Sequence, residues 1–133
     1  MSSSEVALRI LIADDSRLVR SSVCSLLRKQ ASCTVCGEAA TGLEAIEKSA
    51  ELRPDVILLD LSLPDLNGMD AATRIHECSP ESSIVIVTEM DPQTLSFIEL
   101  RSGIRACVSK SRLGRDLLPA IEAAANGRLK APA

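Results

Sequence analysis

The stretch that decides the fold is Val56-Ile57-Leu58-Leu59-Asp60-Leu61-Ser62-Leu63-Pro64-Asp65-Leu66-Asn67-Gly68. Four consecutive apolar residues lead directly into an aspartate, and a loop with proline, asparagine and glycine follows. A run this short, with a β-branched start and no polar alternation, is typical of a strand buried on both faces. Asp60 would then stand at the carboxyl edge of the sheet, where open α/β sheets bind their ligands. Taken alone, the stretch also allows Asp60 to be only a cap of the following loop or helix.

The composition indicates one globular domain. The chain has 133 residues, of which 46% are hydrophobic, a formal net charge of −3 and a single aromatic residue, Phe97. A chain of this length buries about two-thirds of its unfolded surface. The acidic balance argues against a nucleic-acid surface, and the scarcity of rings argues against stacking platforms. No secretory signal or membrane span is visible, and the odd number of cysteines, five, favours reduced thiols in the cytoplasm.

Five short apolar segments alternate with five segments of helical periodicity. The expected strands span residues 8–13, 33–40, 56–60, 84–88 and 105–109, and the expected helices span about 17–30, 42–52, 68–78, 91–102 and 115–125. Such alternation requires right-handed crossovers and a parallel sheet covered on both faces. We therefore predict an α/β fold with five parallel strands in a three-layer α/β/α sandwich.

Several details of the helices and of the domain boundaries also follow from the pattern. Leu43, Ile46 and Ala50 are expected on one side of the second helix. Pro119 is expected in the first turn of the last helix, where no amide partner is lost, and Asn126-Gly127 is expected to end that helix. Residues 1–6 are expected to be a disordered lead, residues 7–127 the domain, and residues 128–133 a tail or the start of an interdomain linker.

Parallel strands bring their carboxyl ends to one crevice. The residues delivered there are Asp14, Asp15, Asp60, Thr88 and Lys110. Two carboxylates about 4 Å apart repel by ~4 kcal/mol at an effective dielectric of about 20, so three of them need a cation or partial protonation. An all-oxygen set suits Mg²⁺ better than zinc. A carboxylate beside Mg²⁺ and a lysine is placed to attack an electrophilic phosphorus, with the hydroxyl bonding one of its oxygens.

The order of these residues resembles the receiver domain of two-component response regulators. The matching positions are Asp14-Asp15, Asp60, Pro64 and Gly68 four and eight residues later, Thr88 and Lys110. The resemblance covers residues 7–127, nearly the whole chain. It implies a flavodoxin-like fold with the strand order 2-1-3-4-5.

The resemblance also implies a role for each residue of the crevice. Asp60 would accept a phosphoryl group from a histidine on a partner kinase. Asp15, Asp60 and the backbone carbonyl of Ser62 would ligate Mg²⁺ directly, and Asp14 would do so through water. Thr88 and Lys110 would bind the phosphoryl oxygens. They would also drive rearrangement of the face formed by the fourth helix, the last strand and the last helix.

A receiver domain would be a cytoplasmic phosphoacceptor rather than an enzyme, with a histidine kinase as its partner. Phosphorylation is also compatible with formation of a homodimer. Residues 41–45 and 124–127 look like receivers that are often joined to a LuxR-type helix-turn-helix domain, which would lie beyond Ala133 and direct the output to transcription. The receiver itself is expected to bind neither nucleic acid nor membrane.

Three positions depart from the family's usual pattern. Cys107 stands where an aromatic residue is usual, Glu89 stands where a small residue usually follows Thr88, and Ser111 stands where a proline often follows Lys110. Thr88, Glu89 and Cys107 belong to the expected switch, so phosphorylation chemistry is better supported than conventional output. An interaction module that works without phosphorylation is therefore an alternative.

Other chemistries receive less support. Cys33-x-x-Cys36 invites a redox or zinc interpretation, but residues three apart on a strand face opposite sides, and His76 is the one histidine of the chain. No G-x-G-x-x-G motif follows the first strand, so a dinucleotide site is unsupported. Haloacid-dehalogenase phosphatases also combine a carboxylate nucleophile with threonine and lysine. They place a second aspartate two residues after the nucleophile, whereas Asp14 and Asp15 are adjacent.

Overall fold

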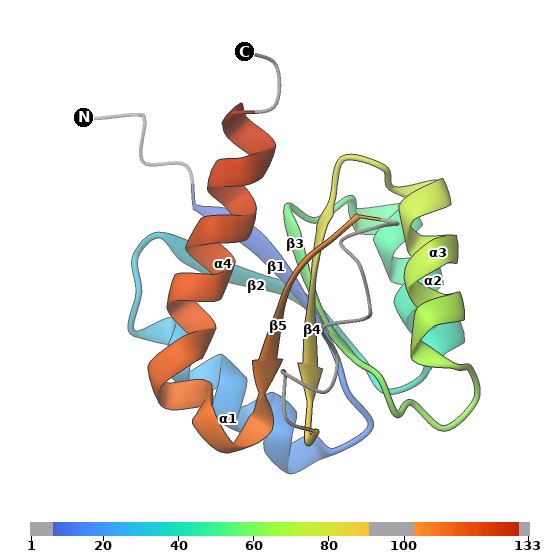
Figure 1. Ribbon diagram of the computed structural model, residues 1–133, viewed down its shortest axis with the longest axis horizontal. Helices are drawn as coiled ribbons and strands as arrows, with labels where there is room; N and C mark the ends of the chain where they lie inside the picture. The colour runs from blue at the N-terminus through green and yellow to red at the C-terminus, as the bar shows by residue number, and fades with distance from the viewer. Residues whose placement is uncertain (1–6, 91–102, 131–133) are drawn as a thin grey trace.

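A fully buried strand lies at the centre of the molecule. The computed structural model describes residues 7–90 and 103–130 (Figure 1). Within them, the strands are β1 (Leu8–Ala13), β2 (Cys33–Ala39), β3 (Val56–Asp60), β4 (Ser83–Thr88) and β5 (Ile104–Ser109). They form one parallel sheet in the order β2-β1-β3-β4-β5, which confirms the predicted fold class and strand order. All five residues of β3 are buried, as its unbroken apolar run predicts.

Helices cover both faces of the sheet. The helices are α1 (Arg17–Arg28), α2 (Gly42–Leu52), α3 (Gly68–Cys78) and α4 (Leu113–Lys130), with a 3₁₀ turn at Lys110–Arg112 before α4. Figure 1 shows α1 and α4 on one face and α2 and α3 on the other. The helix predicted over residues 91–102 lies outside the described residues. No helix in the described part of the chain is long and apolar enough to cross a membrane.

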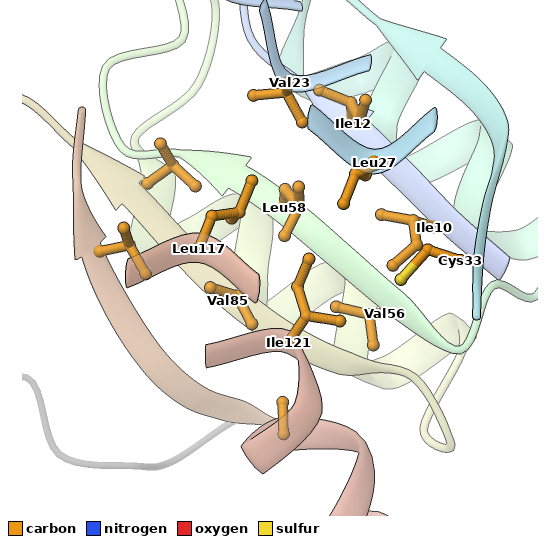
Figure 2. Close-up of a cluster of buried hydrophobic side chains, with 13 residues drawn as sticks. Ile10, Ile12, Val23, Leu27, Cys33, Val56, Leu58, Val85, Leu117 and Ile121 are labelled. Atoms are coloured by element: carbon orange, nitrogen blue, oxygen red, sulfur yellow. The ribbon is translucent and has the colours of Figure 1, made fainter. Parts of the chain in front are cut away.

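Alternation along β3 divides the core into two clusters. Val56 and Leu58 pack with Val23 and Leu27 of α1 and with side chains of α4, as Figure 2 shows. Ile57 and Leu59 face the opposite way and belong to the cluster under α2 and α3. Each fully buried side chain of this size stabilises the fold by about 1.5–3 kcal/mol relative to an exposed position. The core therefore holds β3 rigidly from both sides.

Local side chains start α1 and α2 at the predicted residues, and α2 also ends where the sequence predicts. Ser16 accepts a hydrogen bond from the amide of Val19, and Thr41 accepts one from the amide of Glu44, so both are N-caps. The chain leaves α2 through Arg53, which has a left-handed φ of 47°, immediately before Pro54. Proline disfavours helical geometry in the preceding residue, which is why α2 ends there.

The apolar side predicted for α2 is not its buried side. Leu43 is 52% exposed and Ala50 is exposed, whereas Ala45 and Ser49 are completely buried. Ile46 is half-buried against the core. The small side chains of Ala45 and Ser49, four residues apart, allow α2 to lie close to its neighbours. This close packing determines which side of α2 faces the core, although Leu43 is more hydrophobic.

The predictions for the last helix were wrong at both ends. It begins at Leu113, so Pro119 is the seventh residue rather than part of the first turn. It continues through Asn126-Gly127 to Lys130. Pro119 is exposed, so water can bond the backbone carbonyl that lacks its amide partner, while Leu117 and Ile121 are buried on the inner side. Burial of that inner side outweighs the local cost of the proline.

Replacing Pro119 by alanine should stabilise the protein. Proline inside a helix costs about 3 kcal/mol through its missing hydrogen bond and ring clash, while its restriction of the unfolded chain returns ~0.4–1 kcal/mol. We expect Pro119→Ala to raise the free energy of unfolding by about 2 kcal/mol in a urea titration. Glu122→Ala, an exposed change on the same helix, should stay within about 0.5 kcal/mol of wild type. A less stable Pro119→Ala would contradict this account of α4.

Candidate functional site

The register of the sheet assembles the site at the carboxyl ends of the strands. Asp60 is the last residue of β3 and pairs with Val87, so Thr88 lies one residue further along β4. Thr88 in turn pairs with Ser109, the last residue of β5. The predicted site side chains that stand at or just after these strand ends are Asp14, Asp15, Asp60, Thr88 and Lys110. The carboxylates of Asp14 and Asp60 and the ammonium of Lys110 are in direct contact.

Three carboxylates gather in this crevice. Asp14, Asp15 and Asp60 each offer an oxygen, and these oxygens all lie within 4.8 Å of one another. Asp14 is 2% exposed and Asp60 is 1% exposed, whereas Asp15 faces solvent. One oxygen of Asp14 accepts a hydrogen bond from the amide of Ser16 at 2.9 Å. The acidic cluster predicted from the strand ends is therefore present in the fold.

Lys110 is the cation of the crevice. Its Nζ lies 2.9 Å from Oδ2 of Asp14 and 3.3 Å from Oδ2 of Asp60. Burial by itself lowers the pKa of Lys110, but its hydrogen bond to Asp14 and the negative charges of Asp60 and Asp14 outweigh burial, and the pKa is raised. Lys110 is therefore positively charged at neutral pH. One ammonium among three carboxylates leaves the crevice negatively charged.

The other oxygen of Asp60 is held by Ser62. Both the amide and the hydroxyl of Ser62 donate to Oδ1 of Asp60, each at 3.0 Å. The role expected for the backbone carbonyl of Ser62 stays a prediction, whereas the bond from its hydroxyl was not expected from the sequence. An aspartate followed two residues later by serine is a signal for this kind of local bond. Asp60 thus enters the site with both oxygens already oriented.

Arg20 is a second residue that the sequence analysis missed. Its Nη1 donates to the backbone carbonyl of Asp14 at 2.7 Å, and its Nε pairs with Glu38 at 2.9 Å. These contacts tie the end of β1 to α1 and β2 and so support the position of Asp14. The only signal in the sequence for this role was the position of Arg20 early in the predicted helix. That signal is weak, because arginines at such positions are usually solvated.

The expected switch residues differ in their surroundings. Thr88 is 4% exposed and its hydroxyl accepts a hydrogen bond from the amide of Met90 at 3.1 Å. Glu89, the next residue along the chain, is exposed. Cys107 is half-buried on β5 beside Ile86, and burial raises the pKa of its thiol. Residue 107 therefore contributes a small, neutral side chain to the face of the sheet under α2 and α3.

The pair Cys33 and Cys36 does not form a thiol site. Cys33 packs in the cluster under α1 and α4, while Cys36 packs against the cluster under α2 and α3, as the strand geometry predicts. Both thiols are free, and burial raises the pKa of each. The redox or zinc interpretation of this motif therefore lacks a common site.

The donor set of the crevice fits a hard divalent cation. Three carboxylates within reach of one another supply oxygen ligands, which Mg²⁺ prefers, and the exposure of Asp15 leaves an entry from solvent. The single ammonium of Lys110 compensates only part of the negative charge. A cation of this kind would complete the charge balance.

The fold and the site together define a doubly wound α/β domain with an acidic crevice and a lysine at the carboxyl edge of its sheet. The family model of the response regulator receiver domain matches residues 10–122. The chain belongs to this family and is a receiver domain of two-component response regulators. The resemblance drawn from the sequence is thereby confirmed.

The chain has relatives among transcriptional and other response regulators. It is 37% identical over 120 residues to the uncharacterized transcriptional regulatory protein YxjL of Bacillus subtilis, a match that covers 90% of this chain and 55% of YxjL. It is 31% identical over 122 residues to the response regulator protein VraR of Staphylococcus aureus, covering 92% of this chain and 58% of VraR. The chain thus spans little more than half the length of these relatives.

Solved structures show the same fold. The response regulator domain of Thermotoga maritima CheB matches with a TM-score of 0.81 at 29% identity, covering 90% of this chain and 97% of that one. A two-component response regulator of the LuxR family from Aurantimonas sp. SI85-9A1 matches with a TM-score of 0.83 at 30% identity, covering 92% of this chain and 87% of that one. These matches support the family and its sheet order.

Removing the charge of Lys110 should destabilise the metal-free protein. Lys110→Met leaves two buried carboxylates without their cation, and we expect a loss of about 1–3 kcal/mol in the free energy of unfolding, below the 3–5 kcal/mol of a fully buried pair. Saturating Mg²⁺ should return part of this loss, because a bound cation replaces the missing charge. Lys29→Met, an exposed change, should have little effect.

The stability difference between wild type and Lys110→Met should depend on pH with a defined sign. The pKa of Lys110 is raised in the folded state above its ordinary value of 10.5. Its stabilising contribution is therefore complete below pH 10.5 and declines as the pH rises through the folded-state pKa. The stability difference between wild type and Lys110→Met should stay constant from neutral pH to about pH 9 and shrink in more alkaline solution. A difference that grows with pH would contradict the ion pairs seen here.

Proposed function

We propose that this receiver domain accepts a phosphoryl group on Asp60 from a histidine of a partner kinase. The observation that carries the proposal is the contact of Lys110 with the buried carboxylate of Asp60, in a crevice shared with Asp14 and Asp15. A buried carboxylate with an adjacent ammonium is both protected from water and close to a group that binds phosphoryl oxygens. Membership of the receiver family supports the same assignment.

Mg²⁺ is the cofactor that we propose for this step. The residues that would hold it are Asp15, Asp60 and the carbonyl of Ser62 directly, and Asp14 through water. Mg²⁺ would supply positive charge to the phosphoryl oxygens in a site that otherwise repels an incoming dianion. The clustering of three carboxylate oxygens supports this assignment.

The transfer itself uses groups of this chain. An oxygen of Asp60 attacks phosphorus, the bond between phosphorus and the donor's imidazole nitrogen breaks, and the electron pair of that bond leaves with the imidazole. The product is an acyl phosphate on Asp60. Lys110 then pairs with a phosphoryl oxygen in place of Oδ2 of Asp60, and the hydroxyl of Thr88 donates to another. Asp60 would be phosphorylated and then dephosphorylated once per signal. We therefore propose that the domain is a phosphoacceptor rather than an enzyme that turns over a substrate.

The output that we propose is regulatory. YxjL is described as a transcriptional regulatory protein, and LuxR-family regulators are among the matching structures. We propose that the output is transcriptional, through a LuxR-type DNA-binding domain beyond Ala133. We also propose that the phosphorylated protein forms a homodimer. The five free cysteines favour the reducing cytoplasm as the location.

Acetyl phosphate with Mg²⁺ should label Asp60 once per chain. Intact-mass spectrometry should show one added phosphoryl group that hydroxylamine removes, and chelation of Mg²⁺ should abolish labelling. Asp60→Asn should remain unlabelled, because an amide oxygen is a poor nucleophile, whereas the exposed Asp70→Asn should label like wild type.

Three outcomes would count against the proposal. Undiminished labelling in Asp60→Asn would place the acceptor elsewhere. Rapid multiple turnover of a small phosphate ester would favour a phosphatase. Absence of labelling in wild type, by acetyl phosphate and by kinases alike, would favour an interaction module that works without phosphorylation.

Glu89 should slow the phosphorylation of Asp60. It is exposed directly after Thr88. We propose that its carboxylate adds bulk and negative charge in the path of a dianionic donor. A partly screened repulsion of ~1.4 kcal/mol corresponds to about tenfold in rate. We expect Glu89→Ala to label about tenfold faster with acetyl phosphate, and Glu89→Gln separates charge from size. Rates within about twofold of wild type in both variants would show that Glu89 turns away from the donor.

A further inference from the structure

Asp65 joins the loop after β3 to the start of α2. Its Oδ1 accepts a hydrogen bond from the amide of Gly42 at 2.6 Å, and its Oδ2 accepts one from the amide of Leu43 at 3.0 Å. These two bonds to Leu43 and Gly42 hold the pKa of Asp65 below its usual range. A carboxylate at a helix N-terminus is favoured by the free amides and by the helix dipole. The bonds cross 22 and 23 residues of sequence, so they fasten two separate elements.

α2 does not need Asp65 in order to begin. Thr41 caps the helix by accepting from the amide of Glu44, and the carboxylate of Glu44 accepts from the amide of Ala40 at 2.7 Å. This reciprocal arrangement is close to a capping box made by neighbours in sequence. The contacts of Asp65 with Gly42 and Leu43 are therefore additional to the local cap, and their effect falls on the loop that carries Asp65.

Close packing holds the same loop at two further points. A Cβ atom at Gly42 would lie 2.9 Å from Cβ of Leu66, so the loop rests directly on the first residue of α2. A Cβ atom at Gly68 would lie 2.6 Å from the backbone Cα of Leu61, so the two ends of the loop touch. Leu63 of the same loop is 6% exposed and packs in the cluster under α2 and α3. The loop thus has one defined path, and Asp65 is its polar attachment.

Ser62 stands on this loop and touches the phosphoacceptor. Its amide and hydroxyl both donate to Oδ1 of Asp60. We propose that Asp65 is a positioning residue: by fastening the loop to α2, it holds Ser62 against Asp60. Asp65 acts through Ser62 and touches neither the donor nor the acceptor oxygen itself. Where the readout is Mg²⁺ affinity, the proposal also rests on the function proposed above.

NMR of the metal-free protein tests the proposal without relying on that function. The variants are Asp65→Ala and, as the milder change, Asp65→Asn, whose amide keeps one acceptor oxygen. The matched control is Asp70→Ala, which removes an exposed carboxylate from the first turn of α3, just after the same loop. We expect the order parameter of the Ser62 amide to fall from a rigid value of about 0.85 towards about 0.6 in Asp65→Ala, and less in Asp65→Asn. Asp70→Ala should resemble wild type.

Mg²⁺ titration provides the second readout. Loss of an indirect support of a metal site costs about tenfold to a hundredfold in affinity, and we expect the half-saturating Mg²⁺ concentration of Asp65→Ala to rise about tenfold. If wild type binds no Mg²⁺, the proposed metal site fails while the Ser62 measurement still decides the role of Asp65. A Ser62 amide as rigid as in wild type in both Asp65 variants would overturn the proposal, even if their melting temperatures fall. Should Asp65→Ala not fold, the Ser62 order parameter in Asp65→Asn decides between the two outcomes.

Discussion

The ammonium of Lys110 lies against Asp14 and Asp60, two carboxylates that are almost completely removed from water. Each charge would be costly to bury alone, because it loses its hydration, and the pairing with Lys110 offsets part of that cost. The three groups come from the ends of β1, β3 and β5, so they meet only when these strands run parallel and in register. The contact of Lys110 with the two carboxylates therefore depends on the register of the sheet. Since one ammonium does not neutralise three carboxylates, the crevice still favours a cation and disfavours a lone dianion.

The two sides of the crevice are built differently. On the β3 side, Ser62 is bonded to Asp60 and its loop is fastened to α2 through Asp65. On the β4 side, the chain leaves the sheet through Glu89 and Met90, which are both exposed. A substitution of either residue therefore changes the surface beside the crevice without disturbing the core. The β3 side is therefore fixed by contacts within the fold, whereas the β4 side is open to solvent.

Several features of the fold could be predicted from sequence because they depend on neighbours in the chain. The unbroken apolar run of β3 indicates burial on both faces, and Arg53-Pro54 marks the end of α2. Other features could not be predicted. Leu43 is exposed although it is apolar, because α2 places the smaller Ala45 and Ser49 inward. Pro119 lies inside α4 because burial of the helix's inner side outweighs one missing hydrogen bond.

By itself, the sequence determined the alternation of strands and helices, the parallel sheet and the residues that stand at the strand ends, since periodicity and chain direction decide these. Its motif spacing was enough to identify the family and the strand order. Only the tertiary structure decided that Lys110 contacts both Asp14 and Asp60, that the hydroxyl of Ser62 bonds Asp60, and that Asp65 reaches the amides of α2. These contacts depend on distances of a few ångströms between packed side chains and segments, and no local pattern of residues encodes such distances.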